Sequence, residues 1–172
     1  MAKVLTGFGL AIALWLGQVR TPDIFFSPTR HNIADAMLLL ARIQPTDVVY
    51  DLGSGDGRIP IIAVQKYGAK AVGIELDPRL VDLSWRNANE GLVADKVKFI
   101  VGDLFKADIS EATIVTLYLS KSINNELEPK LRLELKPGTR IVSHDFGIGK
   151  WQPDEVLQVD EATLFLWKVP AR

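Results

Sequence analysis

Cysteine is absent from the 172 residues of this chain, and histidine occurs only twice, as His31 and His144. Without thiols the protein has no disulfide bond, no thiolate zinc site and no cysteine nucleophile. Two isolated histidines also argue against a histidine-rich metal site. We therefore expect a functional site without a metal.

An excess of charge of either sign is also lacking. The 20 lysines and arginines are balanced by 21 aspartates and glutamates, so the formal net charge is −1. Nucleic-acid-binding domains usually carry a strongly basic surface, and we therefore expect no nucleic-acid partner. Hydrophobic residues make up 48% of the chain and charged residues 24%, which predicts one globular domain with a sizeable core.

Charge is missing altogether from residues 4–19, which are flanked by Lys3 and Arg20. As a helix this segment would rise about 24 Å, somewhat less than a typical membrane span. No small-residue cleavage site of the A-x-A type follows it, which argues against a secretory signal. We expect residues 1–20 to be an uncleaved membrane anchor; the alternatives are a signal peptide, or a helix that packs on its own domain or on a partner.

Residues 21–29, which contain two prolines, are expected to form a linker, and residues 30–172 a single catalytic domain. Alternating strands and helices predict a doubly wound, Rossmann-like α/β fold with a mostly parallel sheet. The last two strands are separated by only three residues and predict a C-terminal antiparallel hairpin at the sheet edge. The expected strands are 48–52, 71–75, 97–101, 113–119, 139–143, 156–159 and 163–169, and the expected helices are 31–43, 59–67, 77–91 and 122–135, the last one split at Pro129.

The first strand of this domain runs into a turn with glycine at 53, 55 and 57. This Gly-x-Gly-x-Gly spacing differs from the Gly-x-Gly-x-x-Gly of dinucleotide enzymes, and no Lys-Ser or Lys-Thr pair follows to hold a triphosphate. The carboxylates of Asp51 and Asp56 would repel a pyrophosphate but suit an ammonium or a sulfonium. The loop therefore indicates S-adenosylmethionine as the cofactor.

Acidic residues also end the next two strands. Glu75 is placed to accept hydrogen bonds from both hydroxyls of a ribose, and Asp103 from an adenine amino group, while Leu104 packs on the ring. Each of these alone could be an ordinary solvated strand end or turn, but three such elements in chain order indicate a binding site. The expected cofactor-binding residues are Asp51, Gly53, Ser54, Gly55, Asp56, Gly57, Glu75, Leu76, Asp103 and Leu104.

The acceptor side is expected near the ends of the fourth and fifth strands. Tyr118 could orient an incoming amine, with Thr116 and Ser120 adding hydroxyls beside it, or it could be a half-buried strand aromatic. His144 and Asp145 follow the fifth strand at the same carboxyl edge, where ligands collect in open α/β sheets. The candidate catalytic residues are therefore Tyr118, His144 and Asp145. No Asn/Asp-Pro-Pro-Tyr motif is present, which argues against adenine and glutamine as acceptors.

The order of these motifs resembles class I S-adenosylmethionine-dependent methyltransferases. Asp-Leu-Gly-Ser-Gly-Asp-Gly-Arg at 51–58, Val-Gly-Ile-Glu-Leu-Asp-Pro at 72–78 and Phe-Ile-Val-Gly-Asp-Leu-Phe at 99–105 correspond to their three cofactor motifs. Residues 112–120, residues 131–146 and Trp151 resemble the small protein-lysine methyltransferases, which include broad-specificity archaeal enzymes and mitochondrial enzymes acting on ATP synthase c-subunit or adenine nucleotide translocase. The chain departs from them at 26–30, where Phe-Ser-Pro-Thr-Arg replaces the usual Val-Pro-Thr-Pro run.

This resemblance implies methyl transfer from S-adenosylmethionine to lysine side chains of a protein substrate. Two alternatives stay open from the sequence: a methyltransferase acting on a small molecule or lipid, and a non-catalytic cofactor-binding membrane protein. If residues 4–19 associate with a membrane, the catalytic domain should face the cytosol, where the cofactor is made. The other expected location is the soluble cytoplasm.

Overall fold

The computed structural model describes residues 27–171, so the expected anchor at 1–20 and most of the linker lie outside the described residues. None of the helices within residues 27–171 combines the length and the apolar character needed to cross a bilayer. The elements in chain order are α1 (His31–Leu40), β1 (Val48–Leu52), α2 (Arg58–Tyr67), β2 (Lys70–Glu75), α3 (Pro78–Glu90), β3 (Val97–Val101), β4 (Ile114–Leu117), α4 (Lys121–Glu134), β5 (Arg140–His144), β6 (Glu155–Val159) and β7 (Ala162–Lys168).

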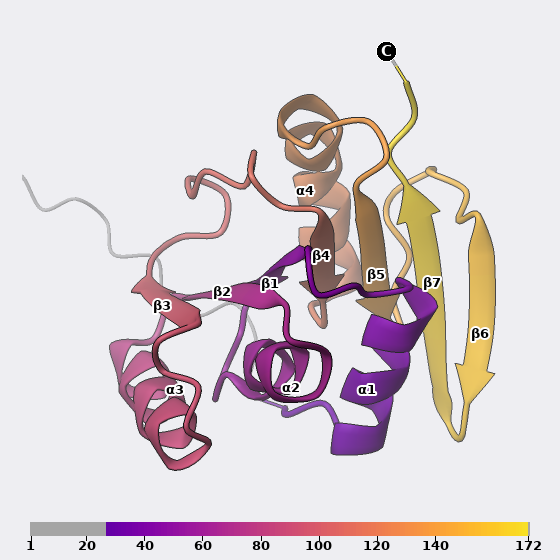
Figure 1. Ribbon diagram of the computed structural model, residues 1–172. Helices are drawn as coiled ribbons and strands as arrows, with labels where there is room; N and C mark the ends of the chain where they lie inside the picture. Colours follow the sequence, from indigo (N-terminus) through magenta and orange to yellow (C-terminus); the bar gives the residue numbers. More distant parts are fainter. Residues whose placement is uncertain (1–26, 172) are drawn as a thin grey trace, which may run out of the picture.

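The strands form one seven-stranded sheet in the order β3-β2-β1-β4-β5-β7-β6. The first five strands in this order are parallel, and β7 runs antiparallel to both β5 and β6. Helices α1, α2 and α3 lie on one face of the sheet and α4 on the other (Figure 1). The predicted doubly wound fold with a C-terminal hairpin is confirmed.

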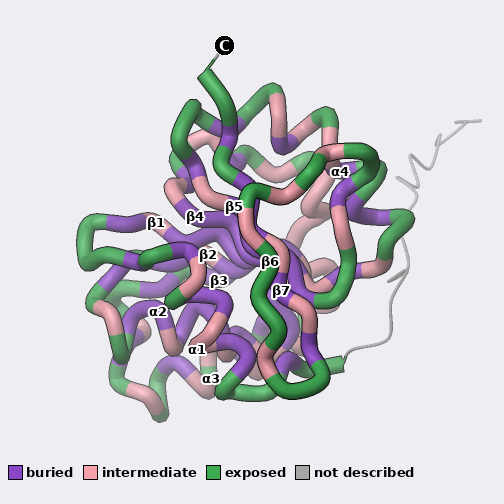
Figure 2. The backbone as a smooth tube through the Cα atoms, turned by 90° about the vertical axis from the view of Figure 1, so that its right-hand side faces the viewer, coloured by how far each residue is buried: buried purple, intermediate pink, exposed green. Residues whose placement is uncertain are grey.

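The core consists of two hydrophobic clusters separated by the sheet. One contains Met37 and Leu38 of α1 and lies under the first three helices, and the other contains Leu127 of α4 and the fully buried Trp167 of β7. Figure 2 shows the buried chain concentrated in the strands between these layers. Strand β4, in the middle of the sheet, is buried at every position, as expected for a parallel strand that is covered on both faces.

Helix α3 begins as the sequence predicts. Asp77 is its N-cap, and the side chain accepts a hydrogen bond from the backbone N–H of Arg79. Pro78 occupies the first helical position, where the missing N–H has no intrahelical partner to lose. This cap fixes the turn directly after β2 and so fixes the position of the strand-end acid, Glu75.

Helix α4 differs from the prediction, because it continues through Pro129 instead of splitting there. Proline lacks the N–H that would bond to the carbonyl of residue 125, yet the apolar face of the helix, with Ile123, Leu127 and Leu131, is buried against the sheet. Packing of this face compensates for the missing bond. The helix is capped by Ser120, whose hydroxyl accepts from the backbone N–H of Ile123.

Strand β4 ends at Leu117, two residues earlier than expected. Tyr118 therefore lies in the segment between β4 and α4 instead of within the strand. The Tyr118 side chain therefore need not follow the alternation of side chains between the two faces of the sheet. It lies at the carboxyl edge of the sheet.

Candidate active site

A cavity of about 710 Å³ opens at the carboxyl ends of β1, β2, β3 and β4. Its size suits a ligand of several hundred daltons, and its place next to the reversal of strand order is where open α/β sheets bind ligands. Ten of the residues expected from sequence line it, namely Asp51, Gly53, Ser54, Gly55, Asp56, Glu75, Leu76, Asp103, Leu104 and Tyr118.

The glycine loop takes the backbone shape that its sequence predicts. Gly53, Gly55 and Gly57 have φ of 81°, 54° and 78°, all in the left-handed region. The backbone N–H groups of Gly53 and Ser54 donate to the carbonyl of Ile74 at 2.8 and 3.0 Å, which anchors the loop to β2. Gly57 is not part of the cavity wall; it caps α2 beneath the loop, where an added Cβ would lie 2.6 Å from the Phe99 ring.

The Glu75 carboxylate joins the loop to the start of α3. One oxygen accepts from the backbone N–H of Gly55 and the other from that of Asp77, both at 3.0 Å. Each carboxylate oxygen can accept a second hydrogen bond, so the group keeps capacity for a ligand diol. The structure thus holds this acid in a fixed orientation at the cavity wall.

Asp51 is the most deeply buried acid of the site, at 4% exposure. Burial raises its pKa to about 7, and the nearby Glu75 and Asp56 act in the same direction, while a 2.7 Å hydrogen bond from the Thr116 hydroxyl opposes them. A cation in the cavity would lower this pKa and convert Asp51 to the carboxylate. Thr116 was expected to place its hydroxyl beside Tyr118, but the hydroxyl donates a hydrogen bond to Asp51 instead.

Asp56 already has a cationic partner. The Arg58 guanidinium binds its carboxylate in a bidentate pair, with N–O distances of 2.9 and 2.6 Å, and the pKa of Arg58 is raised by this pair. A third guanidinium nitrogen donates to the main-chain carbonyl of Thr29 at 2.8 Å. Asp51 and Glu75, at the ends of β1 and β2, are therefore the acids next to the loop whose negative charge is available to a cationic ligand. Arg58 was missed from the sequence, although it is the basic residue next to the loop.

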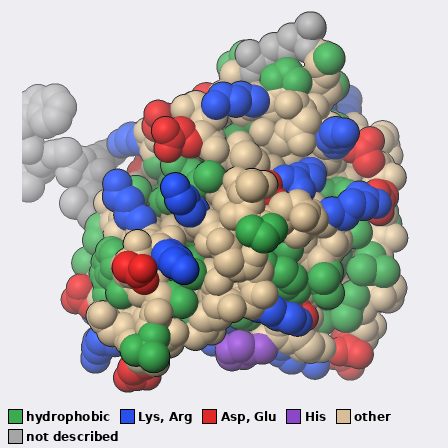
Figure 3. All heavy atoms as spheres, in the orientation of Figure 1, with side chains coloured by type: hydrophobic (Ala, Val, Ile, Leu, Met, Phe, Trp, Pro, Cys, Tyr) green, Lys and Arg blue, Asp and Glu red, His purple; other side chains and the backbone are tan. Residues whose placement is uncertain are grey.

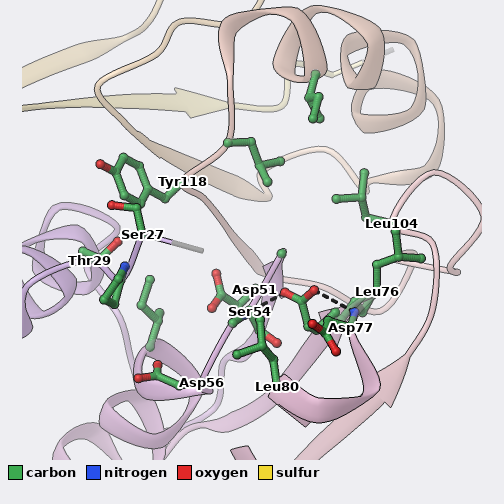
Figure 4. Close-up of a pocket in the computed structure, with 18 of the residues that line it drawn as sticks. Ser27, Thr29, Asp51, Ser54, Asp56, Leu76, Asp77, Leu80, Leu104 and Tyr118 are labelled. Atoms are coloured by element: carbon green, nitrogen blue, oxygen red, sulfur yellow. Dashed lines mark hydrogen bonds between the residues drawn. The ribbon is translucent and has the colours of Figure 1, made fainter. Parts of the chain in front are cut away.

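An apolar side and an aromatic side face each other across the cavity. Leu76 and Leu104 lie on one side and Tyr118 on the other, with Asp51 and Ser54 between them (Figure 4). Asp103 stands next to Leu104, and its carboxylate accepts from the backbone N–H of Phe105 at 2.9 Å. Asp51 thus lies between the Leu76–Leu104 side, which suits a flat ring, and the Tyr118 side of the cavity.

Tyr118 lines the cavity, whereas His144 and Asp145 are not part of its wall. The His144 ring stacks on Tyr118 with centroids 3.9 Å apart and an interplanar angle of 23°. Burial lowers the pKa of His144, although Asp145, 3.4 Å from Nε2, opposes this effect. Nδ1 lies 3.5 Å from the hydroxyl of Thr29, a buried residue of the segment at 26–30 that was not among the expected site residues. The imidazole is therefore placed to hold Tyr118 and the segment at 27–29, which also lines the cavity.

These residues fit S-adenosylmethionine. Asp51 suits its cationic end, the strand-end Glu75 suits a ribose, and Asp103 with Leu104 suits an adenine. They do not fit a pyrophosphate ligand. Such a ligand would require neutral or cationic side chains where this cavity has Asp51 and Glu75.

Comparison with known proteins agrees with this geometry. The family model described as ANTKMT methyltransferase domain matches residues 51–155. The chain is 41% identical to a protein-lysine N-methyltransferase of Saccharolobus islandicus over 83% of this chain and 89% of that protein. It is 39% identical to the adenine nucleotide translocase lysine N-methyltransferase of Mus musculus over 97% of this chain and 76% of that protein.

A solved structure is also similar. It is named as an RNA methyltransferase from Salinibacter ruber in complex with S-adenosyl-L-homocysteine, and it is 53% identical to this chain with a TM-score of 0.84. The similarity covers 85% of this chain and 95% of that one.

Proposed function

The chain belongs to the ANTKMT methyltransferase domain family and is an S-adenosylmethionine-dependent methyltransferase, and from this premise we propose that it methylates lysine side chains of proteins. The observation that carries the proposal is the 41% identity to an archaeal protein-lysine N-methyltransferase across 83% of the chain. That length includes both the cofactor side and the acceptor side of the cavity.

We propose that the cofactor is held by the residues expected from the sequence. Asp51 and the glycine-loop backbone would hold the cationic methionine end, Glu75 the ribose diol, and Asp103 with Leu104 the adenine. When bound, this cofactor supplies a methyl group activated by a positive sulfur. Asp56 would act indirectly, by keeping Arg58 attached to the main chain of Thr29.

The acceptor amine must lose a proton before its nitrogen forms the new N–C bond. A lysine pKa near 10.4 falls as the ammonium enters a less polar channel, so desolvation in the cavity drives the proton to solvent water. Tyr118 would orient the neutral amine, and the ring of His144 would hold Tyr118 in place. Transfer of the methyl group would exchange its bond to sulfur for the new bond to nitrogen, and the thioether that leaves would need no acid from the protein, so alignment of the amine by the cavity would supply most of the catalysis.

RNA is the second candidate acceptor, because the similar structure from Salinibacter ruber is named as an RNA methyltransferase. The charge of this chain does not favour it. The formal net charge is −1, and on the face shown in Figure 3 the cationic and anionic side chains are interspersed. A small molecule or lipid is the remaining alternative from the sequence.

The decisive experiment is methyl transfer from radiolabelled cofactor into a cell lysate by the purified protein. We expect label that protease removes and ribonuclease does not, and mass spectrometry should locate it on lysine. The Glu75→Ala variant is the matched control, because it removes the carboxylate that fixes the loop and faces the cavity. Label confined to RNA, to lipid or to small metabolites would contradict the proposal.

We also propose that residues 1–20 anchor the protein to a membrane and that residues 30–172, the catalytic domain, face the cytosol. The support is the uncharged segment at 4–19 with its basic flanks. Fractionation of cells expressing the full chain or a form without residues 1–20 tests it. Equal partitioning of both forms into the soluble fraction would count against the anchor.

A further inference from the structure

Phe146 is an aromatic residue held at the wall of the cavity in partial contact with solvent. Its exposure is 37%, and it lines the same cavity as Tyr118. Large apolar side chains normally gain free energy by leaving water, so exposure beside a ligand cavity points to a contact made when the cavity is filled.

The backbone that presents Phe146 is strained. Asp145 has φ of 62°, in the left-handed region that side-chain-bearing residues seldom adopt. The N–H of Phe146 donates to the carbonyl of His144 at 2.8 Å, closing a three-residue turn around Asp145. Such strain persists only where the surroundings enforce it, and it concentrates at ligand sites.

Two fully buried polar side chains enforce this turn. The Ser143 hydroxyl donates to the carbonyl of Phe146 at 2.6 Å, and the Asn124 side-chain amide donates to the same carbonyl at 3.1 Å and to that of Gly147 at 3.3 Å. Both side chains have 0% exposure. Burying polar groups costs free energy unless they form hydrogen bonds, and here these bonds converge on the carbonyl of Phe146.

Tyr118 is fixed next to this turn by a different contact. Leu117, the last residue of β4, is in register with Ser143 of β5, so Tyr118 and the turn at 145–146 leave neighbouring strands at the same edge. The Tyr118 ring is stacked on His144. Two aromatic side chains, both held by the segment at 143–146, thus line the acceptor end of one cavity.

We propose that Phe146 determines acceptor specificity, by forming with Tyr118 an apolar passage for the methylene stem of the acceptor lysine. Asn124 and Ser143 are positioning residues, which act by holding the Phe146 turn. The assignment rests on the proposed function, and it explains how a neutral amine is favoured: the passage removes water from the stem and from the nitrogen as it approaches.

The test uses the full chain and a peptide around a lysine that the lysate experiment labels. Phe146→Ala should raise KM for this peptide about tenfold and change kcat less than about threefold, because a stem contact is lost while the reacting groups remain. Two non-reactive versions of the peptide serve as competitive inhibitors, one with norleucine and one with alanine in place of the lysine. The wild type should bind the norleucine peptide at least about tenfold more tightly, from the burial of its extra methylenes, and Phe146→Ala should reduce this preference to below about threefold.

Asn124→Ala should lower the norleucine preference in the same way, although Asn124 never touches the peptide. A loss of stability alone would not change the ratio of two inhibitor affinities. Val156→Ala is the matched control, since Val156 is 58% exposed on β6 and does not line the cavity, and it should leave the ratio unchanged.

The outcomes separate the two proposals. If the wild type labels the peptide but Phe146→Ala leaves both KM and the norleucine preference unchanged, the assignment of Phe146 is wrong and the proposed function stands. If the wild type labels no lysine in any peptide, the proposed function is wrong and the assignment of Phe146 falls with it.

Discussion

Asp51 combines deep burial with a place on the wall of a ligand cavity. Burial raises its pKa to about 7, so that near neutral pH the empty site holds a mixture of the acid and the carboxylate. A cationic ligand stabilises the carboxylate and lowers this pKa, because opposite charges at close range favour ionisation. Binding of the cofactor should therefore release a proton around neutral pH.

Asp51→Asn should weaken binding of S-adenosylmethionine about tenfold to a hundredfold at pH 8, the range expected for a lost charged hydrogen bond. In the wild type the affinity should rise as pH increases through about 7, whereas the variant should show little dependence on pH. Isothermal titration calorimetry in buffers of different ionisation enthalpy measures both the affinity and the protons released.

Thr116→Val is the control, because the Thr116 hydrogen bond keeps the pKa of Asp51 from rising further, and its removal should shift the pH dependence upward. The ligand-free protein should show the opposite trend in stability. The folded-state pKa of about 7 is raised from 3.8, so the stabilisation from protonated Asp51 is complete below pH 3.8 and is lost as pH rises through about 7. Asp51→Asn should therefore unfold at higher denaturant than the wild type above pH 7, and equal stability there would contradict the raised pKa.

Gly57 and Gly138 allow backbone strain to be separated from packing. Both have positive φ, 78° and 88°, but an added Cβ at Gly57 would lie 2.6 Å from the Phe99 ring, whereas at Gly138 nothing lies within 4 Å. Gly138→Ala should lower the free energy of unfolding by roughly 1–2 kcal/mol from strain alone. Gly57→Ala should cost about 1–3 kcal/mol more, from overpacking. Urea denaturation measures both, and equal costs would show that the helix under the loop can move away from Phe99.

At the level of secondary structure, α4 shows how packing overrides local preference. Pro129 lies inside the helix and faces solvent, so it contributes little to the buried face. The helix persists because Leu127 and Leu131, on either side of the proline, are completely buried. A rule applied to the sequence alone therefore predicts a break that tertiary contacts prevent.

Pro129→Ala should raise the free energy of unfolding by about 1–2 kcal/mol. The gain in helix preference of roughly 3 kcal/mol is partly offset by the greater freedom of the unfolded chain, about 0.4–1 kcal/mol, and by the fit of the helix around proline. Chemical denaturation measures the change, and methyl transfer should be unaffected. Leu133→Ala, at a 71% exposed position on the same helix, should change stability by less than about 0.5 kcal/mol. A destabilised Pro129→Ala variant would mean that proline at this position favours the packing of α4 on the sheet.

On the scale of the whole molecule, the cavity lies where four strand ends meet, and its walls come from segments that run from Ser27 to Phe146. A ligand there contacts the glycine loop, the ends of β2 and β3 and the segment after β4 at once. Binding should therefore stabilise the complete domain, not one element of it, because only the folded chain brings these segments together.

S-adenosylmethionine at a hundred times its dissociation constant should stabilise the fold by about 2.7 kcal/mol. For a domain of this size the melting temperature should rise by about 5–10 °C. Differential scanning fluorimetry measures the shift, and Glu75→Ala should reduce it, since Glu75 both orders the loop and faces the cavity. An equal shift in wild type and variant would show that the ligand binds elsewhere.

The sequence by itself determined the alternating fold, the glycine loop and the acids at the ends of β1, β2 and β3. These features depend on residues that are neighbours in the chain, because a left-handed turn or a strand end requires particular residues at short spacing. The parallel order of the strands then brings Asp51, Glu75 and Asp103 to one edge without any further information.

Only the tertiary structure decided which side chains support this site. The Thr116 hydroxyl reaches Asp51 from 65 residues away, Thr29 meets His144 across 115 residues, and Asn124 of α4 holds the Phe146 turn after β5. Such contacts depend on the rotation and spacing of packed elements, which hydrophobic periodicity leaves open. The sequence therefore specifies the acids that line the cavity at the strand ends. The packing of distant elements specifies how Tyr118 and Phe146 are held, because each is placed by a side chain from a different part of the chain.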